Sequence, residues 1–197
     1  MRTRRGRLFV VSGPSGVGKG SVVRQLLERD PEGLGYSVSY STREARLGEV
    51  PGRDYVFVPP HEFERMTVAG RFLEWAEVFG HRYGTAAEPV ERMLAEGRDV
   101  VLEIDVQGAR QVHERVPDAV LIFLVPPSLA ELERRLRSRG TEPEDKLARR
   151  LEKAAFEMDQ SSWFDHVVVN DDLEEATAQV EAIIQTSRNP TQGSTHP

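Results

Sequence analysis

The chain of 197 residues contains no cysteine. It can therefore form no disulfide, and it has no thiolate metal site and no cysteine nucleophile. The absence of cysteine is compatible with a reducing compartment, where disulfides are rare. Any catalysis or metal binding must rely on other side chains.

Long apolar segments are also missing. The basic start of the chain leads into one apolar run, Leu8–Val11, which is much shorter than the apolar part of a signal peptide. No stretch approaches the ~18 apolar residues of a membrane helix. Apolar residues make up 39% of the chain and charged residues 29%, which is ordinary for a globular protein. We expect a soluble, cytoplasmic protein with no membrane partner.

Positive charge is limited as well. The formal net charge is -6, so we expect no nucleic-acid partner. Of the 26 basic residues only Lys19, Lys146 and Lys153 are lysines. Because lysines are this rare, Lys19 within its glycine-rich loop is not a chance member of a lysine-rich surface.

Short apolar runs alternate with helical patterns along the chain. The runs predict strands at Leu8–Ser12, Tyr36–Tyr40, Tyr55–Val58, Phe72–Val78, Asp99–Val106, Val120–Val125 and Val167–Val169. Predicted helices follow Lys19 up to Asp30-Pro31 and span Pro60–Ala69, Pro89–Glu96, Ser128–Arg139, Glu144–Asp159 and Leu173–Thr186. This order predicts an α/β protein with a parallel sheet covered by helices on both faces.

One compact core with two insertions fits this pattern. The core would comprise residues 1–36, 85–126 and 161–186, and the insertions residues 37–84 and 127–160. Residues 187–197 are polar and contain two prolines, so we expect a disordered tail.

A glycine-rich loop follows the first predicted strand and precedes a helix. Its sequence, GPSGVGKGS, matches the G-x-x-x-x-G-K frame of a P-loop NTPase. Glycines let backbone N–H groups face phosphate oxygens, and the helix N-terminus adds partial positive charge. The predicted nucleoside-triphosphate contacts are Gly13, Pro14, Ser15, Gly16, Val17, Gly18, Lys19, Gly20 and Ser21. The alternative, a plain glycine turn, is disfavoured by the flanking strand and helix. The frame alone does not separate a kinase from a GTPase, an ATPase or a transporter subunit.

The loop departs from its frame at one position. Gly20 stands where Ser or Thr would place a hydroxyl on Mg²⁺. Either Ser21 or water takes that role, or the metal is held elsewhere. Asp105 ends an apolar run, as the acid of a Walker B strand does, and could hold Mg²⁺ through water or contact a bound nucleotide.

A charged segment after the first helix suggests a second phosphate site. Arg43 and Arg46 lie three residues apart, with Tyr55 nearby. Arginine side chains can surround a phosphate with paired donors. On composition alone, a solvated charged loop is the better interpretation.

The wider motif pattern resembles the guanylate kinase family. The glycine loop is followed by S-x-S-T-R-x-x-R-x-G-E-x-x-G-x-D-Y-x-F, with the first serine at Ser39. The likeness continues through FLEWAEVFGHRYGT, VLEIDVQGA, RLRSRGTE, ARRL and VVVNDDL, and covers about residues 7–186. This resemblance implies transfer of the γ-phosphoryl group of ATP to GMP, giving ADP and GDP, with Mg²⁺ as cofactor.

The resemblance also implies residue roles for GMP in the 37–84 region. Glu74 would accept hydrogen bonds from guanine N1–H and the exocyclic amine, whereas adenine would present a lone pair to it. The implied GMP-binding residues are Ser39, Arg43, Arg46, Tyr55, Glu74, Tyr83, Thr85 and Asp105. Among them the two arginines and two tyrosines would hold the phosphate.

The charged helices of residues 127–160 resemble the family's mobile lid. Arg135, Arg139 and Arg150 fall on positions that reach the ATP phosphates, and with Lys19 and Arg43 they form the implied catalytic set. Asn170 resembles a family residue near adenine. Exposed positions are expected for Arg134, Arg137 and Arg149.

Three other functions share parts of this pattern. Asp105 to Gly108 fits the D-x-x-G of GTPases, but the chain has no N-K-x-D segment. Glu74 with Thr85 argues against an adenylate-type kinase. Guanylate-kinase-like scaffold domains bind peptides without catalysis, but they typically lack an intact phosphate loop. We therefore expect an active enzyme and leave its oligomeric state open.

Overall fold

The computed structural model describes residues 4–138 and 144–188. The chain divides into two compact units. The first contains Val10 and the residues before it together with Pro31–Ala119, and the second contains Val11–Asp30 and the residues from Val120 onward.

Five strands form the main sheet in the order β2-β7-β1-β8-β9. These strands are β1 (Leu8–Ser12), β2 (Leu34–Tyr36), β7 (Asp99–Glu103), β8 (Val120–Val125) and β9 (His166–Val169). In the first unit β2 and β7 are parallel neighbours, and in the second β8 and β9 are. Every residue of β1 is buried, as are most residues of β7 and β8. Their sequences are mostly apolar without alternation, which is typical of strands covered on both faces. The predicted α/β fold with a parallel sheet flanked by helices is confirmed.

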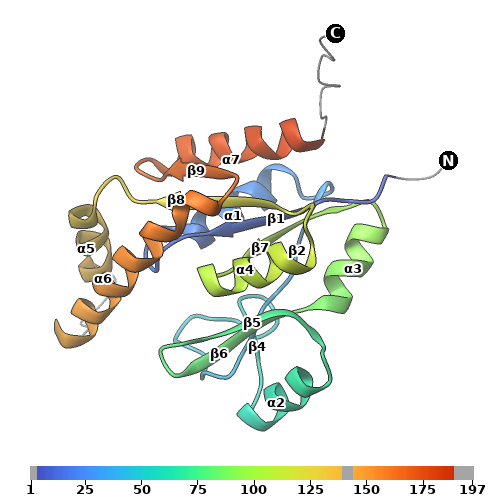
Figure 1. Ribbon diagram of the computed structural model, residues 1–197, viewed down its shortest axis with the longest axis horizontal. Helices are drawn as coiled ribbons and strands as arrows, with labels where there is room; N and C mark the ends of the chain where they lie inside the picture. The colour runs from blue at the N-terminus through green and yellow to red at the C-terminus, as the bar shows by residue number, and fades with distance from the viewer. Residues whose placement is uncertain (1–3, 139–143, 189–197) are drawn as a thin grey trace. The chain divides into compact units, whose positions relative to one another are not determined.

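A smaller sheet in the first unit has the order β4-β3-β6-β5. Its strands are β3 (Tyr40–Ser41), β4 (Val56–Phe57), β5 (Phe72–Val78) and β6 (His81–Ala86). The last two form an antiparallel hairpin that turns at Phe79 and Gly80, both with positive φ (51° and 78°). Two positive φ values are typical of the tight turns that fit the twist of paired strands. Figure 1 shows this hairpin together with α2.

Helices of the first unit are α2 (Pro60–Val68), α3 (Ala87–Ala95) and α4 (Val106–Arg115). Phe63 of α2 is fully buried, and its ring stacks on Phe72 of β5 with the centroids 4.4 Å apart. The start of α4 is capped by Asp105, whose side chain accepts a hydrogen bond from the Gly108 amide. Such a cap satisfies an amide that has no partner inside the helix.

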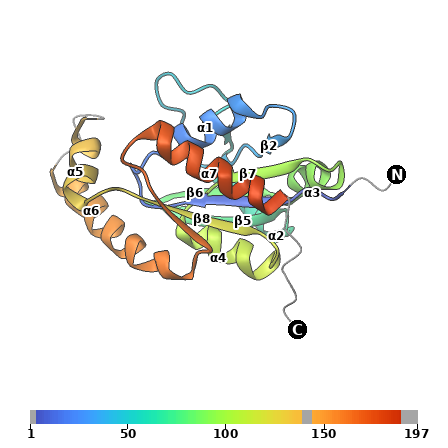
Figure 2. The same ribbon diagram turned by 90° about the horizontal axis from the view of Figure 1, so that it is seen from above.

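The second unit contains α1 (Lys19–Arg29), α5 (Leu129–Ser138), α6 (Glu144–Asp159), a 3₁₀ turn (Gln160–Trp163) and α7 (Leu173–Arg188). Helices α5 and α6 lie side by side in both views (Figures 1 and 2). Their contact buries a cluster of Leu132, Leu136, Leu147 and Ala154, with Leu151 packed against it. The pair therefore has its own small apolar core. Within residues 4–138 and 144–188 no helix combines the length and the apolar character needed to cross a membrane.

Several sequence-based boundaries need correction. The run Tyr36–Tyr40 is not one strand, because β2 ends at Tyr36 in the main sheet and β3 begins at Tyr40 in the small sheet. The run Asp99–Val106 is a strand only to Glu103, since Val106 begins α4. Helix α7 extends to Arg188, two residues beyond its predicted end. The rest of the predicted tail, residues 189–197, lies outside the described residues, and the three-part division of the chain stays a prediction.

Truncating Phe63 tests the packing of α2 on the small sheet. Phe63→Ala removes a fully buried ring, and we expect the free energy of unfolding to fall by about 3–5 kcal/mol. Chemical denaturation measures the change. Val68→Ala on the same helix is the control, because Val68 is 81% exposed, and its effect should stay within about 0.5 kcal/mol. Equal effects of the two variants would contradict the packing.

Candidate functional site

The phosphate loop of the second unit connects β1 to α1. Gly13 and Gly18 have positive φ values of 140° and 102°. A Cβ at Gly13 would lie 2.3 Å from the Leu124 carbonyl oxygen, and one at Gly18 would lie 2.5 Å from Nδ2 of Asn170. Both positions therefore require glycine for conformation and for space. As the frame predicts, a strand precedes the loop and a helix follows it.

The Lys19 ammonium folds back over this loop. Its Nζ donates hydrogen bonds to the carbonyl oxygens of Gly13 at 2.7 Å and Pro14 at 3.2 Å. Among the described residues no side chain caps the N-terminus of α1. Amides at an uncapped helix start, beside a lysine, form a site suited to an anion.

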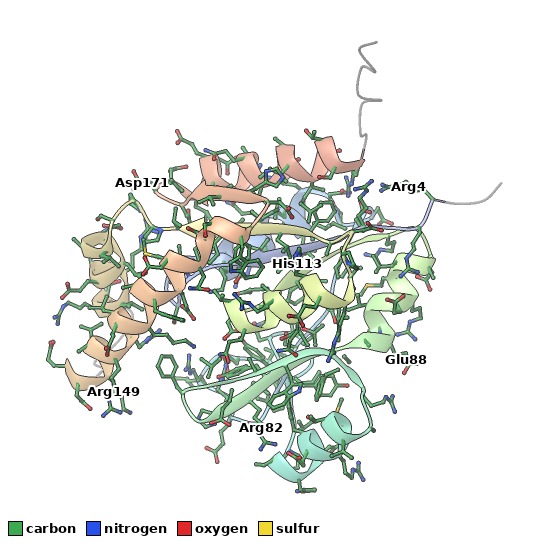
Figure 3. All side chains as sticks on the ribbon, viewed as in Figure 1. Arg4, Arg82, Glu88, His113, Arg149 and Asp171 are labelled. Atoms are coloured by element: carbon green, nitrogen blue, oxygen red, sulfur yellow. The ribbon has the colours of Figure 1, made fainter. Side chains whose placement is uncertain are left out.

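Asn170 supports the loop from inside the second unit, and Arg135 contacts Asn170. Asn170 is buried, and its Nδ2 donates to the carbonyl oxygen of Val17 at 2.7 Å. Arg135 donates to the carbonyl oxygens of Asn170 at 2.7 Å and of Asp171 at 3.2 Å. Figure 3 labels Asp171. In this arrangement Asn170 holds the loop and Arg135 holds the segment that follows β9. Contacts of either side chain with ATP stay predictions.

Helix α6 also reaches the loop. Nη2 of Arg150 donates to the Ser15 hydroxyl at 2.8 Å. Arg139, the third arginine that the resemblance implied, lies outside the described residues. The neighbouring Arg134, Arg137 and Arg149 are exposed, as predicted, and Figure 3 labels Arg149 on α6.

The predicted phosphate-binding residues of the first unit gather around Arg43. Its guanidinium forms two hydrogen bonds of 2.6 Å with the Glu49 carboxylate and is only 7% exposed. It also lies over the Tyr55 ring, with 4.8 Å between Cζ and the centroid, and that ring contacts the ring of Tyr83. Arg46 is exposed, and its amide donates to the same Glu49 carboxylate at 2.8 Å.

The protonation states of Arg43, Glu49 and Tyr55 are determined by their surroundings. Hydrogen bonding to Glu49 raises the pKa of Arg43, and the Arg43 partner lowers the pKa of Glu49. Burial, with the nearby Glu103 carboxylate, raises the pKa of Tyr55 to about 12. The tyrosine is therefore a neutral donor at physiological pH. Sequence reasoning gave Glu49 no role, although its place in the motif beside the two arginines was a signal.

Glu74 and Thr85 lie opposite each other on β5 and β6. The Thr85 hydroxyl donates to Oε1 of Glu74 at 2.6 Å, and Glu74 is 3% exposed. Burial raises the pKa of Glu74 to about 7, with a further contribution from Asp105, while the Thr85 hydrogen bond opposes the shift. A shift of this kind in a buried carboxyl group is typical of a functional site.

Asp105 and Ser39 complete the residues predicted for this unit. Asp105 accepts hydrogen bonds from the Gly108 amide at 3.0 Å and from Gln107 at 3.1 Å. Ser39 is buried just before β3, where its carbonyl oxygen accepts from the Val56 amide. No group of three or more His, Cys, Asp or Glu residues suited to a metal ion occurs within the described ranges.

The fold and the loop geometry define a P-loop protein, the class that binds nucleoside phosphates between a strand and a helix N-terminus. The family model for guanylate kinase matches residues 5–187. The chain belongs to the guanylate kinase family.

Individual relatives agree with this assignment. The chain is 54% identical to a guanylate kinase from Thermus thermophilus over 188 residues, 95% of this chain and 83% of the relative. It is 46% identical to guanylate kinase from Carboxydothermus hydrogenoformans, over 93% of this chain and 90% of the relative. The crystal structure of guanylate kinase from Anaplasma phagocytophilum matches with a TM-score of 0.82 and 37% identity, over 97% and 90% of the two chains.

The Arg43–Glu49 pair predicts a measurable coupling energy. In a double-mutant cycle with Arg43→Met and Glu49→Ala, we expect a coupling of about 1.5–3 kcal/mol in unfolding free energy, because the pair is bidentate and largely removed from water. The control is the exposed pair of Arg5 and Glu91, for which we expect less than about 1 kcal/mol. Equal coupling in the two cycles would refute the prediction.

The raised pKa of Glu74 predicts a pH-dependent stability. The folded chain keeps the Glu74 proton up to about pH 7, whereas an unfolded glutamate loses it near its ordinary pKa of 4.5. The folded state binds more protons in this window, so its stability falls as pH rises. Glu74→Gln stays neutral and removes this loss.

Denaturation of both proteins at about pH 5 and about pH 8 measures the difference. We expect the variant to gain roughly 2–3 kcal/mol relative to the original chain over this interval. Glu77→Gln on the same strand, where Glu77 is exposed, should leave the pH dependence unchanged. A Glu74→Gln variant with unaltered pH dependence would show that the carboxyl group titrates normally.

Proposed function

We propose that this protein is a cytoplasmic ATP:GMP phosphotransferase that converts ATP and GMP to ADP and GDP. Membership of the guanylate kinase family and the similarity to guanylate kinases of bacteria support this activity. Two kinds of site support it independently. One is a loop for triphosphate, and the other is a buried carboxylate beside a cluster of phosphate-binding side chains.

The observation that carries the proposal is the buried Glu74 carboxylate. Guanine presents two neighbouring donors, N1–H and the 2-amino group, and the ionised form of Glu74, which prevails above about pH 7, presents two acceptors. Adenine would set a lone pair against the carboxylate, which leaves buried polar groups unpaired. A mismatch of this kind can give discrimination of up to roughly 10⁴–10⁵. Thr85 fixes the orientation of the carboxylate through its 2.6 Å hydrogen bond.

The phosphate of GMP would bind to the cluster around Arg43. Arg43 and Arg46 supply charge, and Tyr55 and Tyr83 supply neutral donors. Glu49 holds the Arg43 guanidinium from one side, so its position is set before a substrate arrives. Ser39, Thr85 and Asp105 would complete the contacts with GMP.

The triphosphate of ATP would bind to the loop of residues 13–21. Lys19 and the loop amides would hold its phosphate oxygens. Arg135, Arg150 and Arg139 would offset the charge that spreads over the transferred group, and Asn170 would lie near ATP. The GMP phosphate is already an anionic nucleophile, so no strong base is required. Positioning and charge neutralisation supply most of the rate.

Mg²⁺ is the expected cofactor, and the residues present fit a site made largely of water and substrate. Mg²⁺ keeps several waters and uses one or two protein ligands together with substrate phosphates. When bound, it offsets charge between the β- and γ-phosphates. Ser21 is the hydroxyl nearest to the usual position in the loop sequence, and Asp105 is the candidate carboxylate. Ser21 belongs to the second unit and Asp105 to the first, and each is a separate candidate ligand, since Gly20 has no hydroxyl to offer.

The test is ADP formation from ATP and Mg²⁺ with GMP, AMP, CMP, UMP or no acceptor in parallel. We expect ADP only with GMP. Equal ADP without an acceptor would indicate a nucleotidase. GMP binding without turnover by the folded protein would indicate a binding module in place of a kinase.

Base selectivity gives the corresponding mutational prediction. Glu74→Gln replaces one acceptor by a donor, so we expect kcat/KM for GMP to fall by about 100-fold while the KM for ATP is unchanged. Steady-state kinetics with each nucleotide measures the effect. Glu77→Gln should retain full activity, because Glu77 is exposed on the same strand. A loss of less than about twofold for Glu74→Gln would remove Glu74 from base recognition.

A further inference from the structure

Strand β5, which carries Glu74, lies at an edge of the small sheet. An edge strand has a row of backbone groups without a strand partner. The pairing with β6 is also irregular between Phe72 and Glu74, directly before the carboxylate. An irregularity of this kind redirects the side chains next to it and leaves backbone groups unpaired. The position of Glu74 therefore needs support from outside the sheet.

Helix α4 provides this support with two side chains. Gln111 binds both backbone groups of Trp75, the residue after Glu74. Its Oε1 accepts a hydrogen bond from the Trp75 amide at 3.2 Å, and its Nε2 donates to the Trp75 carbonyl oxygen at 2.6 Å. Arg115 donates to the carbonyl oxygens of Phe72 at 2.9 Å and Leu73 at 2.6 Å. The backbone on both sides of Glu74 is thus bound to α4.

Gly108 of the same helix leaves room for the carboxylate itself. A Cβ at this position would lie 2.2 Å from Oε2 of Glu74 and 3.0 Å from its Cδ. Glycine inside a helix costs about 1 kcal/mol relative to alanine, so helix stability does not explain its presence. The presence of glycine is explained by the close approach of the helix backbone to Glu74.

These three residues share one face of α4. Gly108, Gln111 and Arg115 are spaced at i, i+3 and i+7, which places them in one row along a helix. His113, labelled in Figure 3, belongs by the same spacing to the side away from Gly108. Asp105, the second acidic residue predicted for this unit, caps the start of α4. The same helix therefore contacts both Asp105 and the surroundings of Glu74.

We propose that the Gly108, Gln111 and Arg115 face of α4 sets the position of the Glu74 carboxylate and thereby determines selectivity for the guanine base. The inference rests on the proposed function, in which Glu74 reads guanine. All three are positioning residues. The closest ordinary contact of a Cβ is about 3.4 Å, so an alanine at 108 would displace the carboxylate by about 1 Å. A misplacement of this size can cost on the order of 100-fold in rate.

The experiment compares Gly108→Ala, Gln111→Met and the control Glu114→Ala, an exposed position on α4. Turnover and equilibrium binding are measured with GMP and with IMP, which keeps N1–H but lacks the 2-amino group. We expect the first two variants to lose about 10- to 100-fold in kcat/KM for GMP, mainly through KM. Their preference for GMP over IMP should fall by about tenfold, with the KM for ATP unchanged. The control should match the original chain.

Thermal unfolding separates positioning from general damage. Alanine is the better helix former, and this gain offsets part of the cost of crowding the buried carboxylate, so Gly108→Ala should stay folded with an unfolding temperature close to the original while losing selectivity. A lower unfolding temperature with equal losses for GMP and IMP would overturn the inference. So would a preference for GMP that stays at the original value.

A second background tests the contact directly. Glu74→Asp shortens the side chain, so the further loss caused by Gly108→Ala should be smaller in this background than in the original chain. Independent effects of the two changes would contradict a steric contact between them. If the original chain binds GMP without turnover, the proposed function fails, and the GMP and IMP binding constants of the variants still decide the role of α4.

Discussion

Burial of the Glu74 carboxylate is the constraint around which the first unit is organised. A carboxyl group removed from water resists ionisation, which is why its pKa rises to about 7. Its surroundings must orient it without exposing it. Thr85 orients the carboxylate from the neighbouring strand of the hairpin, and α4 holds the adjacent backbone from the open edge of β5. The short sheet and the helix therefore act together to hold one buried carboxyl group.

The cationic side chains of both units are held by acceptors of the chain itself. Arg43 is paired with Glu49, the Lys19 ammonium is bound to loop carbonyl oxygens, and Arg150 is bound to Ser15. Each of these cations therefore has a defined position in the structure. Groups that are already in position need little reorganisation during phosphoryl transfer, and catalysis of this reaction depends mostly on such placement.

Local sequence predicted those elements whose pattern is determined by burial or by strong helix signals. Strand β1 and strand β8 are continuous apolar runs, and α6 has the predicted ends. Strand β6 was missed because HRYGTA is short, polar and contains glycine, and its pairing depends on β5. Helix α4 was missed because the apolar run of β7 continues through Ile104 to Val106, and only the Asp105 cap marks where the helix begins.

The sequence by itself determined the phosphate loop, the fold class and the family, because glycine, lysine and arginine at fixed spacings leave few alternatives. It also supplied Arg43, Glu74 and Thr85 as candidates through their motifs. Only the tertiary structure decided how these residues are held. Gln111 contacts a strand residue 36 positions away, and Gly108 matters through the space that it leaves for Glu74. Neither relation has a local signature, because each arises where two elements distant in sequence pack together.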